Sequence, residues 1–224
     1  MGYQIAIDGP SGSGKSTLAK GIAKKLGVKY VDTGAMYRAV GYYMAKNSVN
    51  LSNSNDIADN MDGICLEASY AGDVFCIILN GEDITEKLRT QEVADYASKV
   101  AVVPVVRERL VKLQQDIAKK YDVVMEGRDI GYRVLKDADL KIFLDASPHV
   151  RTLRRVSELN KKNIPCGYET IRAEIEERDY RDYNRGPDPL AQSEGSVYID
   201  SSGMTEEEVI GCIIGLTGRG VPKG

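Results

Sequence analysis

The chain has 224 residues, a formal net charge of −3, and a single histidine, His149. This mildly acidic balance provides no general attraction to nucleic acid or to an anionic membrane, so a phosphorylated substrate must be held by local clusters of positive charge. One histidine also leaves little room for a His-based metal site or for His-driven catalysis.

The remaining composition indicates a cytoplasmic protein. No apolar run approaches membrane-spanning length, and the N-terminus enters a strand-like segment without a signal peptide. The cysteines show no C-x-x-C spacing and are expected to be reduced and to behave as small apolar residues. They are Cys65, Cys76, Cys166 and Cys212. A disulfide between Cys65 and Cys76 across a hairpin is the one alternative. Nothing in the sequence requires an oligomer, and we expect a monomer.

The first element is an apolar run followed by a glycine-rich loop of the pattern G-x-x-x-x-G-K-S. The loop reads Gly9-Pro10-Ser11-Gly12-Ser13-Gly14-Lys15-Ser16-Thr17 and precedes a helix-like stretch, residues 17–26. Such a loop turns backbone N–H groups toward phosphates, with Lys15 on the β- and γ-phosphates and the Ser16 hydroxyl on Mg²⁺. An ordinary Gly/Ser turn is the alternative, and the strand and helix on either side disfavour it.

Short apolar runs alternate with helical patterns, which predicts an α/β fold with a parallel sheet flanked by helices. The five predicted core strands are Tyr3–Asp8, Lys29–Asp32, Tyr121–Glu126, Leu140–Asp145 and Val197–Asp200. Each ends in or near an acidic residue. Because ligands of open parallel sheets bind at the carboxyl ends of the strands, these acids are positioned for function, with a solvated strand end as the alternative.

Helix signals are clear at several points. Residues 104–120 form a long amphipathic helix, Ser147-Pro148 has the pattern of a helix start, and residues 205–208 have that of a capping box. Residues 63–68 and 74–79 instead read as two antiparallel strands joined by a turn at 71–73. We expect this hairpin to lie in an insert of about residues 62–88 that belongs to a small subdomain.

The second predicted strand continues into Asp32-Thr33-Gly34-Ala35-Met36-Tyr37-Arg38. Thr33 can cap the following helix, with Tyr37 and Arg38 on its first turns. The functional interpretation is a wall for an acceptor substrate, made of a hydroxyl, an aromatic ring and a guanidinium. A capped helix with an exposed arginine is the alternative.

The third predicted strand ends in Glu126-Gly127-Arg128-Asp129. An apolar strand that ends in an acid is the Walker-B position of phosphate-loop enzymes, so Glu126 could order water around Mg²⁺. A structural ion pair between Arg128 and Asp129 is the alternative. Ser98 and Arg107, on either side of Pro104, carry little signal by themselves.

The stretch 176–185 is the most informative after the loop. Ile171 and Ile175 mark the inward face of a helix, and at helical spacing the same face continues with Arg178, Asp182 and Arg185. Charge thus replaces apolar side chains on the covered face. A solvent-exposed helix with ion pairs is the alternative.

These clusters supply many arginines around a phosphate loop and no obvious general base. They suit phosphoryl transfer between phosphate groups, since an acceptor phosphate is already nucleophilic at neutral pH and catalysis consists of positioning and charge neutralisation. The bidentate geometry of arginine suits phosphate. A GTP-binding switch protein is disfavoured because no N-K-x-D motif is present.

At this point the sequence resembles the bacterial cytidylate kinases, in order over nearly the whole chain. The phosphate loop is shared by many families, whereas the other motifs are more specific. The resemblance rests on residues 9–17, 32–38, Arg89-Thr90-Gln91-Glu92-Val93, 126–129, 141–146 and Glu177-Arg178-Asp179 through Asn184-Arg185. It implies a Mg²⁺-dependent transfer of phosphate from ATP to CMP or dCMP, on a phosphate-loop NTPase fold with a monophosphate-binding subdomain and a short lid.

The resemblance also implies roles for individual residues. The loop holds the phosphates of ATP, and Lys15, Arg128, Arg185 and Arg154 take part in catalysis, with Arg154 on the ATP side. The acceptor phosphate would be bound by Arg38, Arg128 and Arg185. Cytosine would be bound by Thr33, Arg107 and Asp129. The sugar would lie near Ser98, Arg178 and Asp182. Tyr37 lines the acceptor wall, and the metal falls to Ser16, with Glu126 through water. Glu126 stands where Asp is also common, and Thr33 where Ser is frequent; both keep the functional group.

One domain is expected over residues 1–224. Its core comprises 1–36, 104–158 and 186–224, with the subdomain at about 37–103 and the lid region at about 159–185, including a short lid from Lys161 to about Cys166. Two alternatives stay open. One is another nucleoside monophosphate or small-molecule kinase on the same fold. The other is an inactive nucleotide-binding regulatory module, which the presence of Arg38, Arg128 and Arg185 disfavours.

Overall fold

The computed structural model describes residues 2–219 and has a five-stranded parallel sheet at its centre, which confirms the predicted fold class. The strand order is β2-β6-β1-β7-β8. Their bounds are β1 Gln4–Asp8, β2 Lys29–Asp32, β6 Val123–Gly127, β7 Leu140–Asp145 and β8 Val197–Asp200. The third predicted strand, Tyr121–Glu126, begins two residues later and ends one residue later than expected. Just before it, the Asp122 side chain accepts a hydrogen bond from Tyr3 N at 2.7 Å.

The register of the sheet brings the carboxyl ends of its strands to one edge. Asp8 at the end of β1 is opposite Gly127, and Asp32 at the end of β2 is opposite Glu126. The middle of the sheet is fully buried, as expected for parallel strands covered on both faces: Ile5, Ile7 and Met125 have no exposed surface. The core therefore fixes the acids at the strand ends, which are the groups that face the site.

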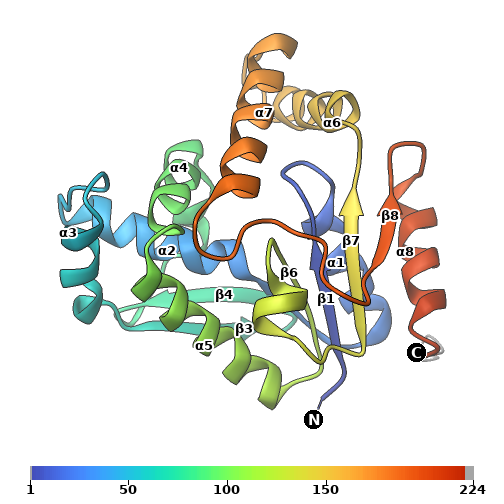
Figure 1. The fold of residues 1–224 in the computed structure, drawn as a ribbon, viewed down its shortest axis with the longest axis horizontal. Coiled ribbons are helices and arrows are strands. Elements are labelled where there is room, and N and C mark those ends of the chain that lie inside the picture. The colour runs from blue at the N-terminus through green and yellow to red at the C-terminus, as the bar shows by residue number, and fades with distance from the viewer. Residues whose placement is uncertain (1, 220–224) are drawn as a thin grey trace.

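Helices surround the sheet and cover its carboxyl edge. α1 Lys15–Leu26 packs beside α8 Glu206–Leu216, and α5 Pro104–Lys120 packs against the short π-helical turn η3 Ile130–Val134. α6 Pro148–Lys161 and α7 Tyr168–Asn184 pack together above the ends of the strands (Figure 1). In the described residues no helix combines the length and the apolarity that crossing a membrane requires.

A second lobe lies beside the sheet, on the left in Figure 1. It contains α2 Thr33–Lys46, α3 Ser54–Asp59, the 3₁₀ turns η1 Met61–Gly63 and η2 Thr85–Arg89, and α4 Gln91–Val100, which packs on α2. The predicted insert forms a three-stranded antiparallel sheet in the order β3-β4-β5. Its strands are β3 Leu66–Ala71, β4 Val74–Leu79 and β5 Glu82–Asp83.

The hairpin was predicted correctly, but its first strand begins at Leu66 and runs to Ala71. The turn is therefore only Gly72-Asp73, and Gly72 adopts a positive φ of 64°, which glycine tolerates without strain. Cys76 pairs with Ser69, whereas Cys65 precedes the strand. All four cysteines are free, so the Cys65–Cys76 disulfide is not formed.

The hairpin packs against the free edge of β2, one of the two edge strands of the central sheet. Tyr70 Oη donates to Tyr30 O at 3.2 Å, and Lys29 Nζ donates to Gly72 O at 3.2 Å. Phe75 packs edge-to-face against both Tyr30 and Tyr70. The insert is thus attached to the core at β2, next to the strand end that carries Asp32.

Candidate active site

The loop after β1 has the backbone geometry that a phosphate cradle requires. Gly9 has a φ of 153°, and a Cβ there would lie 2.0 Å from Leu144 O, so no other residue fits. Gly14 has a φ of 94° and is the N-cap of α1, which begins at Lys15. The first turn of this helix directs its free N–H groups into the loop, which is the arrangement that binds anions.

Lys15 is buried within the loop. Its Nζ donates to Pro10 O at 2.6 Å and to Ser13 Oγ at 3.3 Å. Burial, with a further contribution from the positive charge of Arg128, lowers the pKa of Lys15 to about 7. A buried ammonium next to a guanidinium favours a negatively charged ligand, because the anion restores the charge balance that water would otherwise supply.

Ser16 and Glu126 are hydrogen-bonded at the floor of the loop. Ser16 Oγ donates to Glu126 Oε1 at 2.5 Å, and Tyr30 Oη donates to the same oxygen at 3.2 Å. A hydroxyl and a carboxylate are hard oxygen ligands that suit Mg²⁺. Among the residues that the structure describes, no group of three or more His, Cys, Asp or Glu side chains could hold a metal. This donor set fits an ion that keeps most of its water and takes phosphate oxygens.

The helix after β2 begins one residue earlier than the predicted cap implies. Asp32, not Thr33, is the N-cap of α2 and accepts a hydrogen bond from Ala35 N at 2.8 Å. Thr33 is the first helical residue, and its hydroxyl donates to Glu126 O at 2.7 Å. Arg38 is half-buried and pairs with Asp32 at 2.9 Å, so the alternative of an exposed arginine is also wrong.

The arginines of the charged helix face the end of β6. Arg128 Nε lies 2.6 Å from Asp182 Oδ2, so Arg128 and Asp129 do not pair with each other as the alternative supposed. Arg178 lies in the same region, and its buried Nε has no hydrogen-bond partner in the described structure. Burial and the neighbouring Arg128 lower the pKa of Arg178 to about 10. Two adjacent guanidiniums with a shared acid form a site for an anion.

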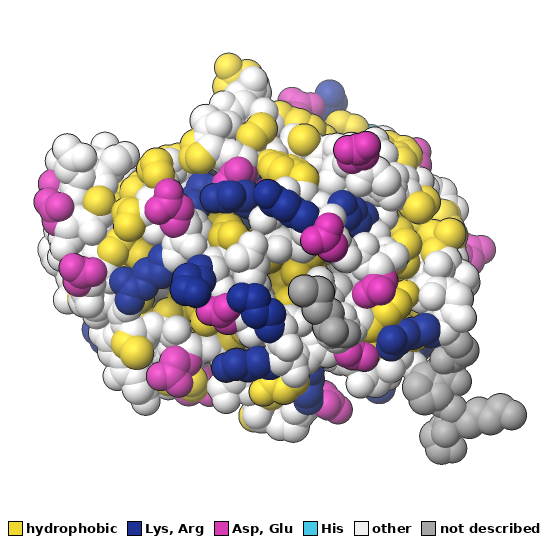
Figure 2. Space-filling view, turned by 60° about the horizontal axis from the view of Figure 1, so that its bottom comes forward, with side chains coloured by type: hydrophobic (Ala, Val, Ile, Leu, Met, Phe, Trp, Pro, Cys, Tyr) yellow, Lys and Arg dark blue, Asp and Glu magenta, His cyan; other side chains and the backbone are white. Residues whose placement is uncertain are grey.

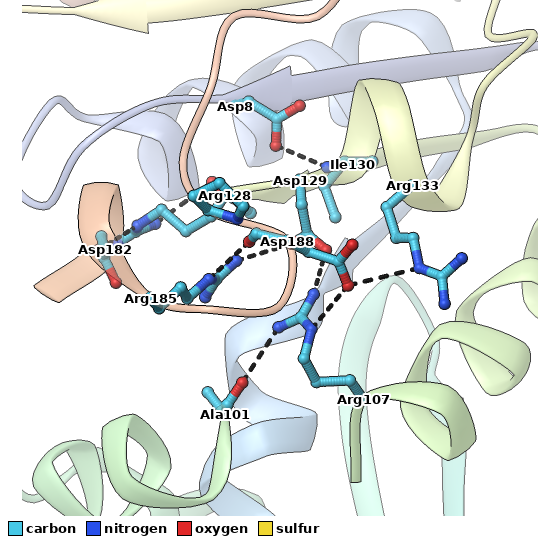
Figure 3. Close-up of polar contacts among 12 residues, drawn as sticks. Asp8, Ala101, Arg107, Arg128, Asp129, Ile130, Arg133, Asp182, Arg185 and Asp188 are labelled. Carbon is cyan, nitrogen blue, oxygen red and sulfur yellow. Dashed lines mark hydrogen bonds and ion pairs between the residues drawn. The ribbon is translucent and has the colours of Figure 1, made fainter. Parts of the chain in front are cut away.

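A second polar cluster lies on the other side of Asp129 (Figure 3). The fully buried Arg107 donates to Asp129, to Asp188 Oδ2 at 2.8 Å and to Ala101 O at 3.3 Å. Arg185 Nη2 donates to the second oxygen of Asp129 at 3.3 Å. Burial raises the pKa of Asp129, an effect that its two arginine neighbours oppose. The cluster presents a carboxylate and a guanidinium side by side.

Three other predicted residues have different surroundings. Tyr37 places its ring 5.7 Å from the Arg107 guanidinium, so it belongs to the second cluster. Arg154 donates to Ser13 O at 3.3 Å and to Ser201 O at 2.7 Å, which places it on the loop side. Ser98 donates to Ala94 O of its own helix at 3.3 Å, and no contact with the arginines is found within residues 2–219.

The sequence did not single out three residues that hold the site together. Asp188, which lies between Pro187 and Pro189, pairs with both Arg107 and Arg133. Asp8 accepts from Ile130 N at 2.8 Å and Gly131 N at 2.7 Å, and its position as a strand-end acid was the available signal. Arg151 is buried and donates to Ser11 O at 2.9 Å while pairing with Asp179; nothing in its spacing marked it.

Comparison with known proteins gives consistent matches. The sequence pattern of the cytidylate kinase family matches residues 5–218. A protein of Caldicellulosiruptor saccharolyticus named cytidylate kinase is 44% identical over 212 residues, covering 95% of this chain and 94% of that one. One of Clostridium botulinum with the same name is 44% identical over 219 residues, covering 98% and 99%. A crystal structure of an uncharacterized protein from Eubacterium ventriosum has a TM-score of 0.54 at 14% identity, covering 97% and 99%; this last likeness concerns the fold alone.

Proposed function

The chain belongs to the cytidylate kinase family, and from this we infer that it is a kinase that transfers a phosphoryl group from ATP to CMP, giving ADP and CDP. We propose dCMP as a second acceptor, magnesium as the metal, and a monomer in the cytoplasm as the working form. The four free cysteines agree with a reducing compartment.

One observation carries the proposal best: an anion site and a base-reading pair meet at the end of β6, beside the phosphate loop. Arg128, with Asp182 as its partner, comes directly before Asp129, which pairs with Arg107. An acceptor that has a phosphate at one end and a hydrogen-bonding base at the other matches these two clusters. The positive charge of Arg128 lowers the pKa of Lys15 in the phosphate loop. The phosphate loop, which would bind the donor, therefore lies next to the cluster that would bind the acceptor.

The proposed donor half is the loop and its flanking residues. The N–H groups at the start of α1 and the Lys15 ammonium bind the phosphates of ATP, while Arg154 approaches the loop at Ser13 O. Ser16 and Glu126 hold the Mg²⁺ that accompanies ATP, with Glu126 acting through water. When bound, this metal neutralises charge on the phosphates.

The proposed acceptor half reads both ends of CMP. Arg38, Arg128 and Arg185 hold its phosphate, and Arg178 and Asp182 lie near the sugar together with Ser98. The Asp129 carboxylate accepts from the cytosine N4 amine and Arg107 donates to O2 or N3, with Thr33 and Tyr37 lining the pocket. Uracil presents a carbonyl where cytosine presents the amine, so a carboxylate at this position disfavours UMP.

The chemistry needs no general base from this chain. A phosphate acceptor attacks as the dianion, and the protein's work is to bring two anions into line and to stabilise the charge that spreads over the transferred group. Lys15, Arg128 and Arg185 provide that charge. Closure of the monophosphate-binding subdomain, about residues 37–103, and of the lid region, about 159–185, would exclude water from the donor phosphate.

An acceptor panel tests the proposal. Release of ADP from ATP and Mg²⁺ is followed with CMP, dCMP, UMP and AMP at matched concentrations, and CMP should give the highest kcat/KM. A preference for AMP or UMP would mean that the specificity is wrong even if kinase activity is present. Binding of ATP and CMP without turnover would instead support the inactive regulatory module.

A further inference from the structure

A well-defined cavity lies outside the cluster that reads the acceptor. It has a volume of about 650 Å³ and lies between α1, β2, the start of α2 and the three-stranded insert. Asp32 and Arg38 are the only residues of the proposed active site that line it. Lys15, Arg107, Arg128 and Asp129 do not contribute to its walls. The volume falls in the range of small-molecule binding pockets.

Its walls are rich in positive charge. The basic residues that line it are Lys20, Lys24, Lys29, Arg38 and Arg89, against the two acids Asp32 and Asp73. The cavity thus has an excess of positive charge, although the net charge of the whole chain is −3. Basic side chains also gather on the side where the strands begin (Figure 2), so they are not confined to the active site. Lys20 and Lys24, one turn apart on α1, have no ion pair in the described residues.

The floor of the cavity is apolar and aromatic. Tyr30 and Phe75 are both buried, with ring centroids 6.3 Å apart at an angle of 73°. Lys20 Nζ lies 5.3 Å from the centre of the Tyr30 ring, so a cation and an aromatic surface adjoin. Lysines above an aromatic floor match a ligand that has a planar ring and several negative charges.

We propose that this cavity is a second nucleotide site, which takes a nucleoside triphosphate with its phosphates on Lys20 and Lys24 and its base against Tyr30 and Phe75. Binding is independent of which acceptor the enzyme uses. The regulatory consequence below rests on the proposed function.

Two contacts connect the cavity with the active site. Tyr30 of the floor donates to Glu126 at 3.2 Å, and Glu126 accepts from Ser16 of the phosphate loop. Arg38 of the wall pairs with Asp32 at 2.9 Å and is a proposed ligand of the acceptor phosphate. A triphosphate in the cavity competes for the Arg38 guanidinium. The bound nucleotide therefore raises the KM for CMP more than it changes kcat.

The chain contains only two phenylalanines, Phe75 in the cavity and Phe143 in β7, where it stacks on Tyr198. Labelling with fluorophenylalanine gives two ¹⁹F NMR signals, one for each position. On titration with CTP or GTP, the Phe75 signal should shift to saturation, and inorganic tripolyphosphate should bind more weakly because it lacks a ring. If neither CTP nor GTP shifts the Phe75 signal to saturation, the proposal is wrong. It is also wrong if tripolyphosphate binds as tightly as the nucleotides.

Matched variants separate the two sites. Lys20→Ala/Lys24→Ala should weaken the Phe75 response by roughly tenfold or more, the equivalent of about 1.4 kcal/mol. Lys25→Ala, an exposed lysine on the same helix that does not line the cavity, should leave it unchanged. Lys15→Ala, which disables the donor loop, should also retain it. A response lost in Lys15→Ala and kept in the double variant would assign the nucleotide to the active site and refute the second one.

Kinetics provide the second arm. CTP should raise the KM for CMP in the native enzyme and in Lys25→Ala. The increase should be far smaller in Lys20→Ala/Lys24→Ala. Without CTP, the kcat of this double variant should equal that of the native enzyme. Equal inhibition of all three proteins would show ordinary competition at the active site and would contradict the regulatory link. If the chain has no kinase activity at all, the ¹⁹F result still decides whether the site exists.

Discussion

The Arg107 guanidinium and the Asp129 carboxylate form a buried ion pair at the end of β6, with Arg107 only 1% exposed. Replacing Asp129 by Asn keeps the shape of the side chain and removes the negative charge that we propose accepts a hydrogen bond from the cytosine amine. We expect kcat/KM for CMP to fall by about 2–3 kcal/mol of transition-state stabilisation, with a smaller preference for CMP over UMP and an almost unchanged KM for ATP. Steady-state kinetics with both acceptors measure this.

Asp188→Asn is the matched control, since Asp188 is the other carboxylate partner of Arg107, at 2.8 Å. It should lower the free energy of unfolding and leave the base preference close to native. If both variants change the preference equally, the assignment of Asp129 to the base is wrong.

Lys15→Ala should remove most of the turnover. The ammonium is preorganised within the loop, and loss of such a charge at the transferred group costs on the order of 3 kcal/mol or more, a drop of at least a hundredfold in kcat. Lys25→Ala, on the exposed side of the same helix, should retain native kcat. Near-native turnover of Lys15→Ala, with a folded circular dichroism spectrum, would refute its role.

Arg185→Met should mainly lower kcat, because the guanidinium next to Asp129 is proposed to bridge the acceptor phosphate. A loss of about a hundredfold corresponds to the removal of one charge-assisted donor. Arg154→Met, on the loop side, should instead raise the KM for ATP. The reverse assignment of these two effects would place each arginine on the wrong substrate.

Ser16 and Glu126 should act as a unit toward the metal. Glu126→Gln removes the negative charge next to the Ser16 hydroxyl, so we expect a higher Mg²⁺ concentration at half-maximal rate. The effect of Ser16→Ala combined with Glu126→Gln should be smaller than the sum of the single changes, because the two side chains touch at 2.5 Å. If the effects of the two single variants on the Mg²⁺ titration add up to the effect of the double variant, Ser16 and Glu126 act on the metal independently.

Stability should depend on pH through Asp8. Burial raises the pKa of Asp8 to about 7, whereas an unfolded chain has a value of about 3.9. The folded state therefore binds the proton more tightly between these values, and the free energy of unfolding falls as the pH rises from about 4 to about 7. Asp8→Asn should flatten this fall by on the order of 2–4 kcal/mol in urea denaturation.

The measurement is best kept at or below about pH 7. The pKa of Lys15 is lowered to about 7, so between that value and its unfolded value this group binds more protons in the unfolded chain and contributes stability that rises with pH. An Asp8→Asn variant whose profile from about pH 4 to 7 matches the native one would mean that another group controls the dependence.

The sequence predicted the fold well because its signals were local. Alternating apolar runs set the five strands, and the charged continuation of the Ile171 and Ile175 face was confirmed by the burial of both isoleucines and by the Arg128–Asp182 pair. The capping signal at Asp32-Thr33 was assigned one residue too late, because both side chains can cap a helix and only tertiary contact sends the Thr33 hydroxyl to Glu126.

The partners of the charged residues could not be predicted. Arg107 and Asp188 are far apart in sequence and meet only because the segment after α7 folds back over α5. Arg151 looked like one of several basic residues in an amphipathic helix, and its burial against the phosphate loop depends on the approach of β1 to β7. Pairings of this kind depend on topology, which spacing along the chain does not specify.

The contact of the hairpin with β2 also bears on self-association. β2 is one of the two edge strands of the central sheet, and its outward carbonyl at Tyr30 accepts a hydrogen bond from the Tyr70 hydroxyl, while Lys29 donates to Gly72 O at the tip of the hairpin. An uncovered parallel edge would offer a row of backbone groups to a second chain. The insert therefore protects the β2 edge from pairing with another chain, and shortening it should lower the solubility of the protein before it lowers the free energy of unfolding.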